Sequence, residues 1–305
     1  MVDGPRTSGT ILVTGASGML GSEVVRTAAA QGCTVIGTHH ETPVMIGGHE
    51  TVRMPLEDAT ALEAVVKRFA PDVVIHCAAL TNVDYCEANP DHAFAVNAVA
   101  SAVLARTASR SGARYLYVST DAVFDGTRGW YEETDECRPV NVYAASKLRG
   151  EEGSLTEHAA AVVVRLAPFG RSARTGKRSL AEWVLAELEA GGTISGFVDA
   201  IFTPMYAGDL ARRFLELTQT RARAGVYHLG SRDAVSKYQF ACALASAAKR
   251  PTDDVRAMSI LDHPFRAKRP LNVSLLTSKA ARDMGWKMPS VREGIEQFLR
   301  VAPGA

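Results

Sequence analysis

The sequence predicts an α/β protein with a doubly wound parallel sheet, followed by a smaller mixed α/β lobe. Short apolar runs alternate with longer helical patterns as far as residue 166, as they do in βαβ units. A glycine-rich turn follows directly on the first apolar run, and after Gly170 the regular alternation weakens. These observations predict a sheet built mainly by the first half of the chain.

The predicted elements of this first half follow one another in order. Thr10–Thr14 is apolar on both faces, which is typical of a central parallel strand, and Met19–Gln31 carries apolar residues at helical spacing. The further predicted strands are Cys33–Gly37, Val73–Cys77, Arg114–Ser119 and Ala160–Leu166. The further predicted helices are Thr60–Phe69, Asp91–Arg110 and one that begins near Tyr143.

The second half predicts a lobe that covers the carboxyl edge of the sheet. Its expected helices are Ser179–Ala190, Leu210–Thr218 and Lys237–Lys249, and its expected strands are Thr193–Val198 and Gly225–Leu229. We therefore expect a dinucleotide-binding domain at residues 1–170 and a substrate-binding lobe at residues 171–305, with some exchange of strands or helices between them. No low-complexity linker or solenoid repeat separates the two.

Composition excludes several classes of protein. The 305 residues carry 34 Lys and Arg against 33 Asp and Glu, so the chain lacks the excess positive charge that attracts a nucleic acid or an anionic membrane. Binding of a small anionic ligand is still possible, because it needs only a local cluster of donors. The five cysteines are scattered without a CxxC pair, which argues against a disulfide framework and a zinc site and favours reduced thiols. No apolar run approaches the ~18 residues of a membrane span, and the first residues lack a leader pattern, so we expect a cytoplasmic protein.

The glycine turn predicts a dinucleotide site. Gly15, Gly18 and Gly21 lie between the first strand and the first helix, where a tight turn, a close backbone approach to a pyrophosphate and tight helix packing all favour glycine. The helix N-terminus then offers N–H groups to the anion. This context predicts a Rossmann-type fold, although a plain glycine-rich turn is the alternative.

The end of the second strand favours NADP over NAD. An NAD site usually has a carboxylate here for the ribose 2′-hydroxyl, but the sequence reads Gly37-Thr38-His39-His40, with no carboxylate before Glu41. Small or weakly basic side chains tolerate a 2′-phosphate better. The plainer alternative is that both histidines belong to a surface loop.

Tyr143 and Lys147 lie four residues apart, on one face of a predicted helix. A phenol has a pKa of about 10, and a neighbouring ammonium is expected to lower it towards the useful range. Lys147 can also hold a nicotinamide ribose. Thr120, at the carboxyl end of a predicted strand, can donate to a substrate carbonyl, and Asn97 is either a support for Lys147 through water or a surface amide.

These motifs together carry a family resemblance. The segments GASGMLG, HCAALTNVD, STDAVFDG, PVNVYAASK and KRPLNVSLL resemble the extended short-chain dehydrogenase/reductases, and within them the RmlD-like (dTDP-4-dehydrorhamnose reductase) branch. Asp199 with the segment Thr203–Leu210, and Arg269–Leu275, match two further motifs of this family, so that the resemblance extends to about Trp286.

The resemblance implies hydride transfer from NAD(P)H, with NADPH favoured, to C4 of a nucleotide-linked 4-keto-6-deoxysugar. Thr120, Tyr143 and Lys147 take the catalytic positions. The implied cofactor-binding residues are Gly15, Ser17, Gly18, Met19, Leu20, Thr38, His39, Leu56, Ala78, Ala79, Leu80, Asn97, Tyr143 and Lys147. The implied substrate-binding residues are Val83, Thr120, Asp121, Ala122, Phe169 and Arg269.

Two departures from the family pattern lie in the substrate pocket. Ala122 stands where the family often has an aromatic residue, and Phe169 stands one position beyond a family tryptophan that touches substrate. The sugar and its nucleotide therefore stay open. Two other functions stay open as well: an NAD-dependent epimerase or dehydratase, and an NADP-binding regulatory subunit resembling the methionine adenosyltransferase β subunit.

Two basic runs are candidates for a clamp on the substrate's diphosphate, because guanidinium groups match phosphate oxygens. The first run holds Arg171, Arg174, Lys177 and Arg178, and the second holds Arg266, Lys268 and Arg269. Two solvated loops are the plainer alternative, and Arg269 is the preferred ligand of the set. Glu23 occupies a position at which relatives bind a bridging magnesium, but a carboxylate in a first helical turn is favourable without metal, so we predict none. A homodimer stays open.

Overall fold

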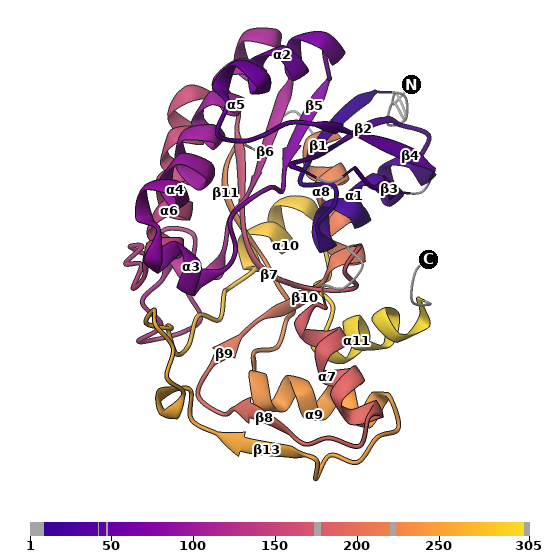
Figure 1. Ribbon diagram of the computed structural model, residues 1–305, viewed down its shortest axis with the longest axis vertical. Coiled ribbons are helices and arrows are strands. Elements are labelled where there is room, and N and C mark those ends of the chain that lie inside the picture. The colour runs from indigo at the N-terminus through magenta and orange to yellow at the C-terminus, as the bar shows by residue number, and fades with distance from the viewer. Residues whose placement is uncertain (1–8, 42, 47, 174–177, 220–223, 302–305) are drawn as a thin grey trace.

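The computed structural model describes residues 9–41, 43–46, 48–173, 178–219 and 224–301. It shows a layered α/β body above a smaller lobe (Figure 1). The strands of the body are β1 (Thr10–Thr14), β2 (Thr34–His39), β3 (Met45–Ile46), β4 (His49–Arg53), β5 (Val73–His76), β6 (Arg114–Val118), β7 (Val162–Phe169), β10 (Pro204–Tyr206) and β11 (Gly225–Leu229). Its main helices are α1 (Met19–Ala30), α2 (Ala59–Phe69), α3 (Val83–Ala88), α4 (Pro90–Phe94), α5 (Ala100–Ser111), α6 (Val142–Glu157), α8 (Ala207–Gln219) and α10 (Ser278–Met284).

Among the described residues, nine strands form one sheet in the order β10-β7-β6-β5-β1-β2-β4-β3, and β11 pairs with β7. All of these pairs are parallel except β3 with β4. The strand order reverses at β1, whose neighbours are β2 and β5. Ligand clefts in open parallel sheets form beyond the carboxyl ends of the strands at such a reversal.

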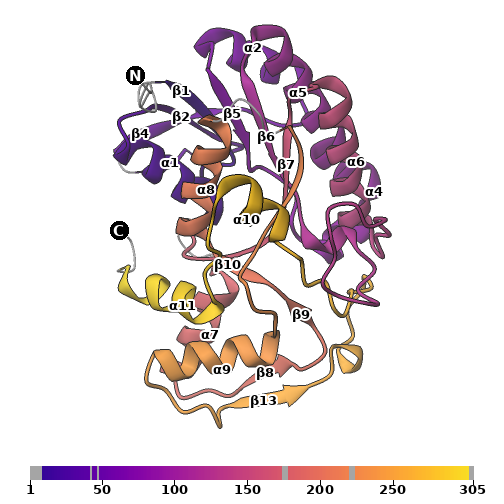
Figure 2. The same cartoon turned by 180° about the vertical axis from the view of Figure 1, so that it is seen from behind.

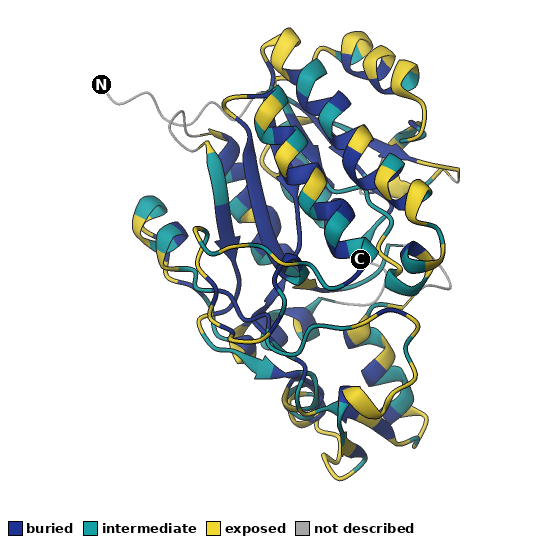
Figure 3. Ribbon diagram, turned by 90° about the vertical axis from the view of Figure 1, so that its left-hand side faces the viewer, coloured by how far each residue is buried: buried dark blue, intermediate teal, exposed yellow. Residues whose placement is uncertain are grey.

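Successive side chains of a strand supply the two faces of the sheet. Ile11 and Val13 join the core under α1 and α8, whereas Leu12 joins the core under α2 and α5. Both faces are therefore covered by helices, which explains why the central strands are apolar without alternation (Figures 2 and 3).

The smaller lobe has its own apolar core. It contains β8 (Ile194–Phe197), β9 (Ile201–Phe202), β12 (Val235–Ser236), β13 (Val255–Met258), α7 (Leu180–Glu189), α9 (Lys237–Ala247) and α11 (Val291–Arg300). Ser179, Ser236 and Ser290 each begin a helix with a reciprocal capping box, in which the serine and a Glu or Gln three residues later satisfy free N–H groups. The buried rings of Phe240 and Phe298 are in the core between these helices.

The α/β fold class with its parallel sheet is confirmed. β1 and β11 have the predicted bounds, but β2 extends through His39, and β3, β4 and α3 were not predicted. The predicted helix Asp91–Arg110 is divided into α4 and α5 by a π-helical turn at Ala95–Val99.

The division at residue 170 does not follow the sheet. β10, α8 and β11 return to the body, because β10 and β11 pair with β7 and α8 packs against α1. These segments lie beyond residue 170 in the chain, but their apolar faces fit the sheet. The two-part division itself stays a prediction.

No helix of the described part of the chain is long and apolar enough to cross a membrane. The five cysteines are free thiols, and Cys86 is buried.

Candidate active site

A cleft of about 980 Å³ lies where the lobe meets the carboxyl edge of the sheet. The residues of the glycine turn, the end of β2 and the loop after β5 line one end, and Thr120, Asp121, Tyr143 and Lys147 line it further along. Residues of the smaller lobe, among them Phe197, Phe202 and Lys237, complete the wall. Of the predicted site residues, all but Asn97 and Val83 line this cleft.

The glycine turn has the shape that a dinucleotide requires. Gly15 has a φ of +65°, and a Cβ there would lie 2.7 Å from the Ala78 Cα atom, while a Cβ at Gly21 would meet the Gly15 carbonyl. Gly18 is the N-cap of α1 and no side chain caps this helix, nor does an acidic residue occupy its first turn. The helix therefore presents N–H groups to the cleft, which fits a pyrophosphate.

A buried histidine fixes the opposite wall of this end. His76 bonds through Nδ1 to the Thr14 hydroxyl (2.6 Å) and through Nε2 to the Ser101 hydroxyl (3.0 Å), and the Ala78 N–H donates to Thr14 Oγ1 (3.1 Å). Burial, and then the nearby Lys147, lowers the pKa of His76 to about 3, so the ring stays neutral. This network sets the path of the chain after β5.

Gly15→Ala is expected to weaken NADPH binding by more than about tenfold and to destabilise the fold by about 1–3 kcal/mol, because the new methyl group meets backbone and the positive φ strains any other residue. Fluorescence titration with NADPH and thermal unfolding measure the two effects. Gly191→Ala is the matched control, since Gly191 also has a positive φ (+73°) but open space around it; it shares the strain and should keep wild-type NADPH affinity. Equal losses of affinity in both variants would contradict the close approach at Gly15.

The adenosine end contains an acidic residue that the sequence did not place there. Thr38 and His39 are buried in β2 and line the cleft, so His39 is not in a surface loop, whereas His40 is exposed. Glu57 lines the same end, with its carboxylate 3.0 Å from His92 Nε2 and 3.4 Å from His40 Nε2. The Glu57 carboxylate is thus paired with two imidazoles. The end of β2 itself carries no acidic residue.

Tyr143 and Lys147 are both on α6, which begins at Asn141, whose side chain accepts from the Ala144 N–H (2.9 Å). The Lys147 ammonium donates to the Val118 carbonyl (2.7 Å) and lies 4.1 Å from the centre of the Tyr117 ring. The Thr120 hydroxyl donates to Asp121 Oδ1 (3.1 Å). All three catalytic candidates therefore meet at one place in the cleft.

The expected lowering of the phenol's pKa by Lys147 is wrong for this structure. Burial raises the pKa of Tyr143 to about 12, an effect that the Thr120 hydrogen bond partly offsets. Lys147 is committed to Val118 and Tyr117, and burial lowers the pKa of Lys147 to about 7, against the opposing charge of Glu151. The phenol is therefore protonated at neutral pH, which suits a proton donor.

Asn97 supports the cleft without lining it. It lies in the π-helical turn, where its Oδ1 accepts from the Leu80 N–H (2.8 Å) and its Nδ2 donates to Ser146 Oγ (3.0 Å). Asn97 is 1% exposed, so it is not a surface amide, and its predicted support of Lys147 and the cofactor stays a prediction. The extra residue of a π turn is often found at functional sites, and here it aims an amide at the cleft wall.

The substrate end differs from its prediction at two residues. Val83 begins α3 and does not line the cleft. Phe169 borders the cleft but is only 3% exposed, and its ring packs 5.1 Å from Phe240 and 6.0 Å from Tyr206 between centroids. Its packing places it in the core of the smaller lobe, so stacking on a sugar is not supported.

Among the described residues, one arginine of each basic run reaches the cleft, so the predicted clamp stays a prediction. The Arg171 guanidinium donates to the Val301 carbonyl (2.8 Å), and Arg266 and Lys268 are exposed outside the cleft. Arg178 and Arg269 line the cleft, and Arg174 and Lys177 lie outside the described residues. Arg269 Nη2 bonds to Asp84 Oδ2 (2.9 Å), while its Nη1 is buried without a partner.

Glu23 lies in the second turn of α1, beyond the first turn in which it was placed, and pairs with Arg26 (2.9 Å). Among the described residues no group of three or more His, Cys, Asp or Glu side chains could hold a metal ion.

Sequence reasoning placed the smaller lobe over the carboxyl edge of the sheet but did not identify the residues by which this lobe lines the cleft. Lys237, Phe197 and Phe265 line the cleft from that side. One local signal was available for Lys237: the Ser236–Gln239 spacing marks a helix start, and a cation in a first helical turn opposes the helix dipole.

A Rossmann-type sheet, an uncapped glycine turn and a Tyr–Lys pair beside a strand-end Thr, with a second lobe over the cleft, define an extended short-chain dehydrogenase/reductase. The family model described as the RmlD substrate binding domain matches residues 9–302, and the chain belongs to this family.

Relatives with assigned names agree with this family. The chain is 37% identical to "Probable low-salt glycan biosynthesis reductase Agl14" of Haloferax volcanii, over 93% of this chain and 95% of that protein. It is 36% identical to dTDP-4-dehydrorhamnose reductase of Mycobacterium tuberculosis, over 88% and 85%. It is 32% identical to methionine adenosyltransferase 2 subunit beta of Xenopus tropicalis, over 94% and 87%.

A solved structure, dTDP-4-dehydrorhamnose reductase of Bacillus anthracis in complex with NADP, superposes with a TM-score of 0.86. The two chains are 26% identical, and the match covers 96% of this chain and 99% of that one.

Proposed function

We propose that the protein is an NADPH-dependent reductase of a nucleotide-linked 4-keto-6-deoxysugar, similar in activity to dTDP-4-dehydrorhamnose reductase. One observation carries the proposal: the protonated phenol of Tyr143 and the hydroxyl of Thr120 face the same cleft as the glycine turn. The similarity to two proteins named as reductases and to an NADP complex supports it.

NADPH, held along the glycine turn, supplies the hydride when it is bound. Thr120 and Tyr143 hold the keto oxygen between two hydroxyl donors, and Tyr143 gives its proton to that oxygen as the carbonyl is reduced. To donate to the substrate, Thr120 exchanges its bond to Asp121 for one to the keto oxygen. Lys147 lies one helical turn from Tyr143, and its ammonium would supply positive charge to an anionic cofactor held in the cleft.

NADPH affinity is expected to fall above pH 7. Burial lowers the pKa of Lys147 to about 7, so the free protein loses this ammonium as the pH rises from 7 to 9, and with it an attraction for the anionic cofactor. The dissociation constant should rise by up to about tenfold per pH unit in this range and be level below it. Burial lowers the pKa of His39, which lines the same cleft, below its ordinary value, so this imidazole loses no charge as the pH rises from 7 to 9.

Fluorescence titration of NADPH between pH 6 and pH 9 measures this dependence. Lys147→Met is the comparison, which should bind weakly at every pH and show no rise between pH 7 and pH 9. A rise of the same size in Lys147→Met would assign the titration to another group.

The direct test of the function is the oxidation of NADPH, and of NADH for comparison, by purified protein with a set of nucleotide 4-keto-6-deoxysugars. We expect loss of absorbance at 340 nm in proportion to the sugar added, and more efficiently with NADPH. Conversion of a sugar without net loss of NADPH would instead indicate an epimerase or dehydratase.

A second candidate is a cofactor-binding subunit of another enzyme. The 32% identity to a methionine adenosyltransferase 2 subunit favours it, and that match covers 94% of this chain. Affinity purification that recovers a stoichiometric partner, together with NADPH binding and no turnover of any ketosugar, would support this candidate. Turnover of a ketosugar would favour the reductase.

A further inference from the structure

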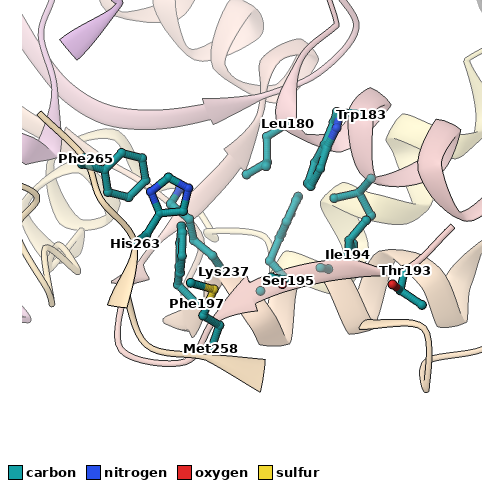
Figure 4. A pocket seen from close by; sticks show the side chains of 14 residues that line it. Leu180, Trp183, Thr193, Ile194, Ser195, Phe197, Lys237, Met258, His263 and Phe265 are labelled. Atoms are coloured by element: carbon teal, nitrogen blue, oxygen red, sulfur yellow. The ribbon is translucent and has the colours of Figure 1, made fainter. Parts of the chain in front are cut away.

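Lys237 is a lysine of the smaller lobe that faces the cleft. It is the first residue of α9, where its N–H donates to the Ala200 carbonyl (3.0 Å) and Ser236 caps the helix. It lines both the main cleft and a second cavity of about 430 Å³ that opens beside it. Figure 4 shows Lys237 close to the rings of Phe197 and His263 at one end of this second cavity.

The surroundings of this ammonium disfavour its charge. Within the described residues it makes no hydrogen bond or salt bridge, and the ring of Phe202, whose centre is 4.2 Å from Nζ, offsets only part of this cost through a cation–π contact. It also lies at the N-terminal end of an 11-residue helix, where the backbone dipole repels a cation. Burial lowers the pKa of Lys237, although the charge of Asp121 opposes this. A bound anion would relieve all of these costs.

The gap between Lys237 and the catalytic group is open to a ligand. The residue whose charge most favours the ammonium is Asp121, next to Thr120 on the opposite wall. Burial raises the pKa of Asp121 to about 6, with Lys237 as the main opposing influence. Among the described residues the two side chains do not form a salt bridge, so the Lys237 ammonium retains its capacity for an anion.

A second cation without a full set of partners faces the same region. Arg269 Nη1 is buried and unpartnered, while Asp84 and the ring of Phe265 (4.6 Å from its centre to Cζ) hold the rest of the guanidinium. Phe265 and Lys237 line both cavities, so the two cations lie near the junction between the catalytic cleft and the aromatic second cavity. A ligand with its sugar at Thr120 and its base among these rings would place its phosphates at this junction.

We propose that Lys237 binds the diphosphate of the nucleotide sugar and sets the preference for diphosphate-linked substrates. This inference rests on the proposed function, because it assigns a further substrate-binding residue to the same reaction. Lys237 belongs to the smaller lobe, so its positive charge reaches the substrate site only when this lobe packs against the sheet. Arg269 lines the same cleft and adds a second positive charge there.

The test compares Lys237→Met, Lys237→Arg and a control, Lys67→Met, which removes the same charge from the exposed face of α2. Calorimetry measures the binding of dTDP, UDP and GDP, and of the corresponding nucleosides, to the NADPH-loaded protein. For the diphosphate that binds best, Lys237→Met should lose about 10- to 100-fold in affinity, the range of a charged hydrogen bond, and Lys237→Arg should regain part of it. Nucleoside and NADPH affinities should change by less than about twofold, and Lys67→Met should match the wild type in every measurement.

Thermal unfolding separates this role from a structural one. Because the ammonium lies at a helix N-terminus and makes no hydrogen bond or salt bridge with the described residues, Lys237→Met should unfold at the same or a higher temperature than the wild type. A lower unfolding temperature with parallel losses of nucleoside and NADPH affinity would make Lys237 a structural residue and overturn the proposal. Unchanged diphosphate affinity in Lys237→Met, or no binding of any diphosphate to the wild type, would overturn it as well.

The outcome is distinguishable from failure of the proposed function. If the wild type reduces no ketosugar but binds a nucleoside diphosphate through Lys237, the binding role stands and the reductase activity fails. If the wild type reduces a ketosugar and Lys237→Met keeps its KM, the activity stands and the role of Lys237 fails.

Discussion

Tyr143→Phe is expected to lower kcat for ketosugar reduction by about a thousandfold, since a positioned general acid contributes about 10²–10⁴ in rate. Burial raises the pKa of Tyr143 to about 12, so the wild-type phenol carries its proton throughout the neutral range, and phenylalanine removes that proton without changing the ring. NADPH affinity should stay within about twofold of the wild-type value, and the unfolding temperature should stay within about 2 °C. The reason is that, among the described residues, the phenol bonds only to the Thr120 side chain.

Steady-state oxidation of NADPH and a separate NADPH titration measure the two parts of this prediction. Tyr238→Phe is a matched control, because this variant also loses a phenol hydroxyl, but Tyr238 is on α9 and does not line the cleft. Retention of a tenth or more of wild-type kcat in Tyr143→Phe would show that another group donates the proton. Joint loss of turnover, NADPH binding and stability would indicate damage to the fold instead.

Arg165→Met is expected to destabilise the fold by about 3–5 kcal/mol and to lower the unfolding temperature by about 10 °C. Arg165 on β7 and Glu151 on α6 form a two-pronged ion pair, with Nη2 2.7 Å and Nε 3.1 Å from the carboxylate, and both side chains are nearly inaccessible (6% and 3%). Burial alone disfavours the arginine's charge, and the bonds to Glu151 reverse this and raise the pKa of Arg165 above its ordinary value. Removing the arginine leaves a buried carboxylate whose remaining bond comes from the Ser119 hydroxyl.

Chemical and thermal unfolding measure this loss. The double variant Glu151→Leu/Arg165→Met should recover most of it, because an apolar pair avoids burying a lone charge. The buried location explains the size of the effect: the exposed pair of Arg149 and Glu152, on the same helix, should contribute less than about 1 kcal/mol. A loss below about 1 kcal/mol in Arg165→Met, or a double variant no better than the single one, would contradict this account.

Much of the fold was accessible to sequence reasoning because its patterns are local. The apolar run Thr10–Thr14 and the glycines that follow it predicted a buried strand and a dinucleotide turn, and both are in place. The four-residue spacing of Tyr143 and Lys147 predicted one helix face. β3 escaped because it is only two residues long, and β4 escaped because Val52 is its one apolar residue among five.

The details of the site depend on contacts between distant parts of the chain. The spacing of Tyr143 and Lys147 suggested that the ammonium acts on the phenol, but the ammonium bonds to Val118, from β6, and burial governs the phenol. The Asn97 side chain likewise bonds to Leu80 and Ser146. Both partners lie on other elements, so the local sequence around Asn97 does not predict these bonds. Such pairings follow from which elements pack together.

The amino-acid sequence by itself determined the α/β class, the glycine turn and the candidate catalytic side chains, because strand burial, backbone freedom at glycine and helical spacing are properties of short segments. Only the tertiary structure decided the protonation of Tyr143, the burial of the Arg165–Glu151 pair and the meeting of Lys237 with Asp121 across the cleft. Desolvation and long-range electrostatics depend on everything that surrounds a group in space, and the chain brings those surroundings together from different strands and helices.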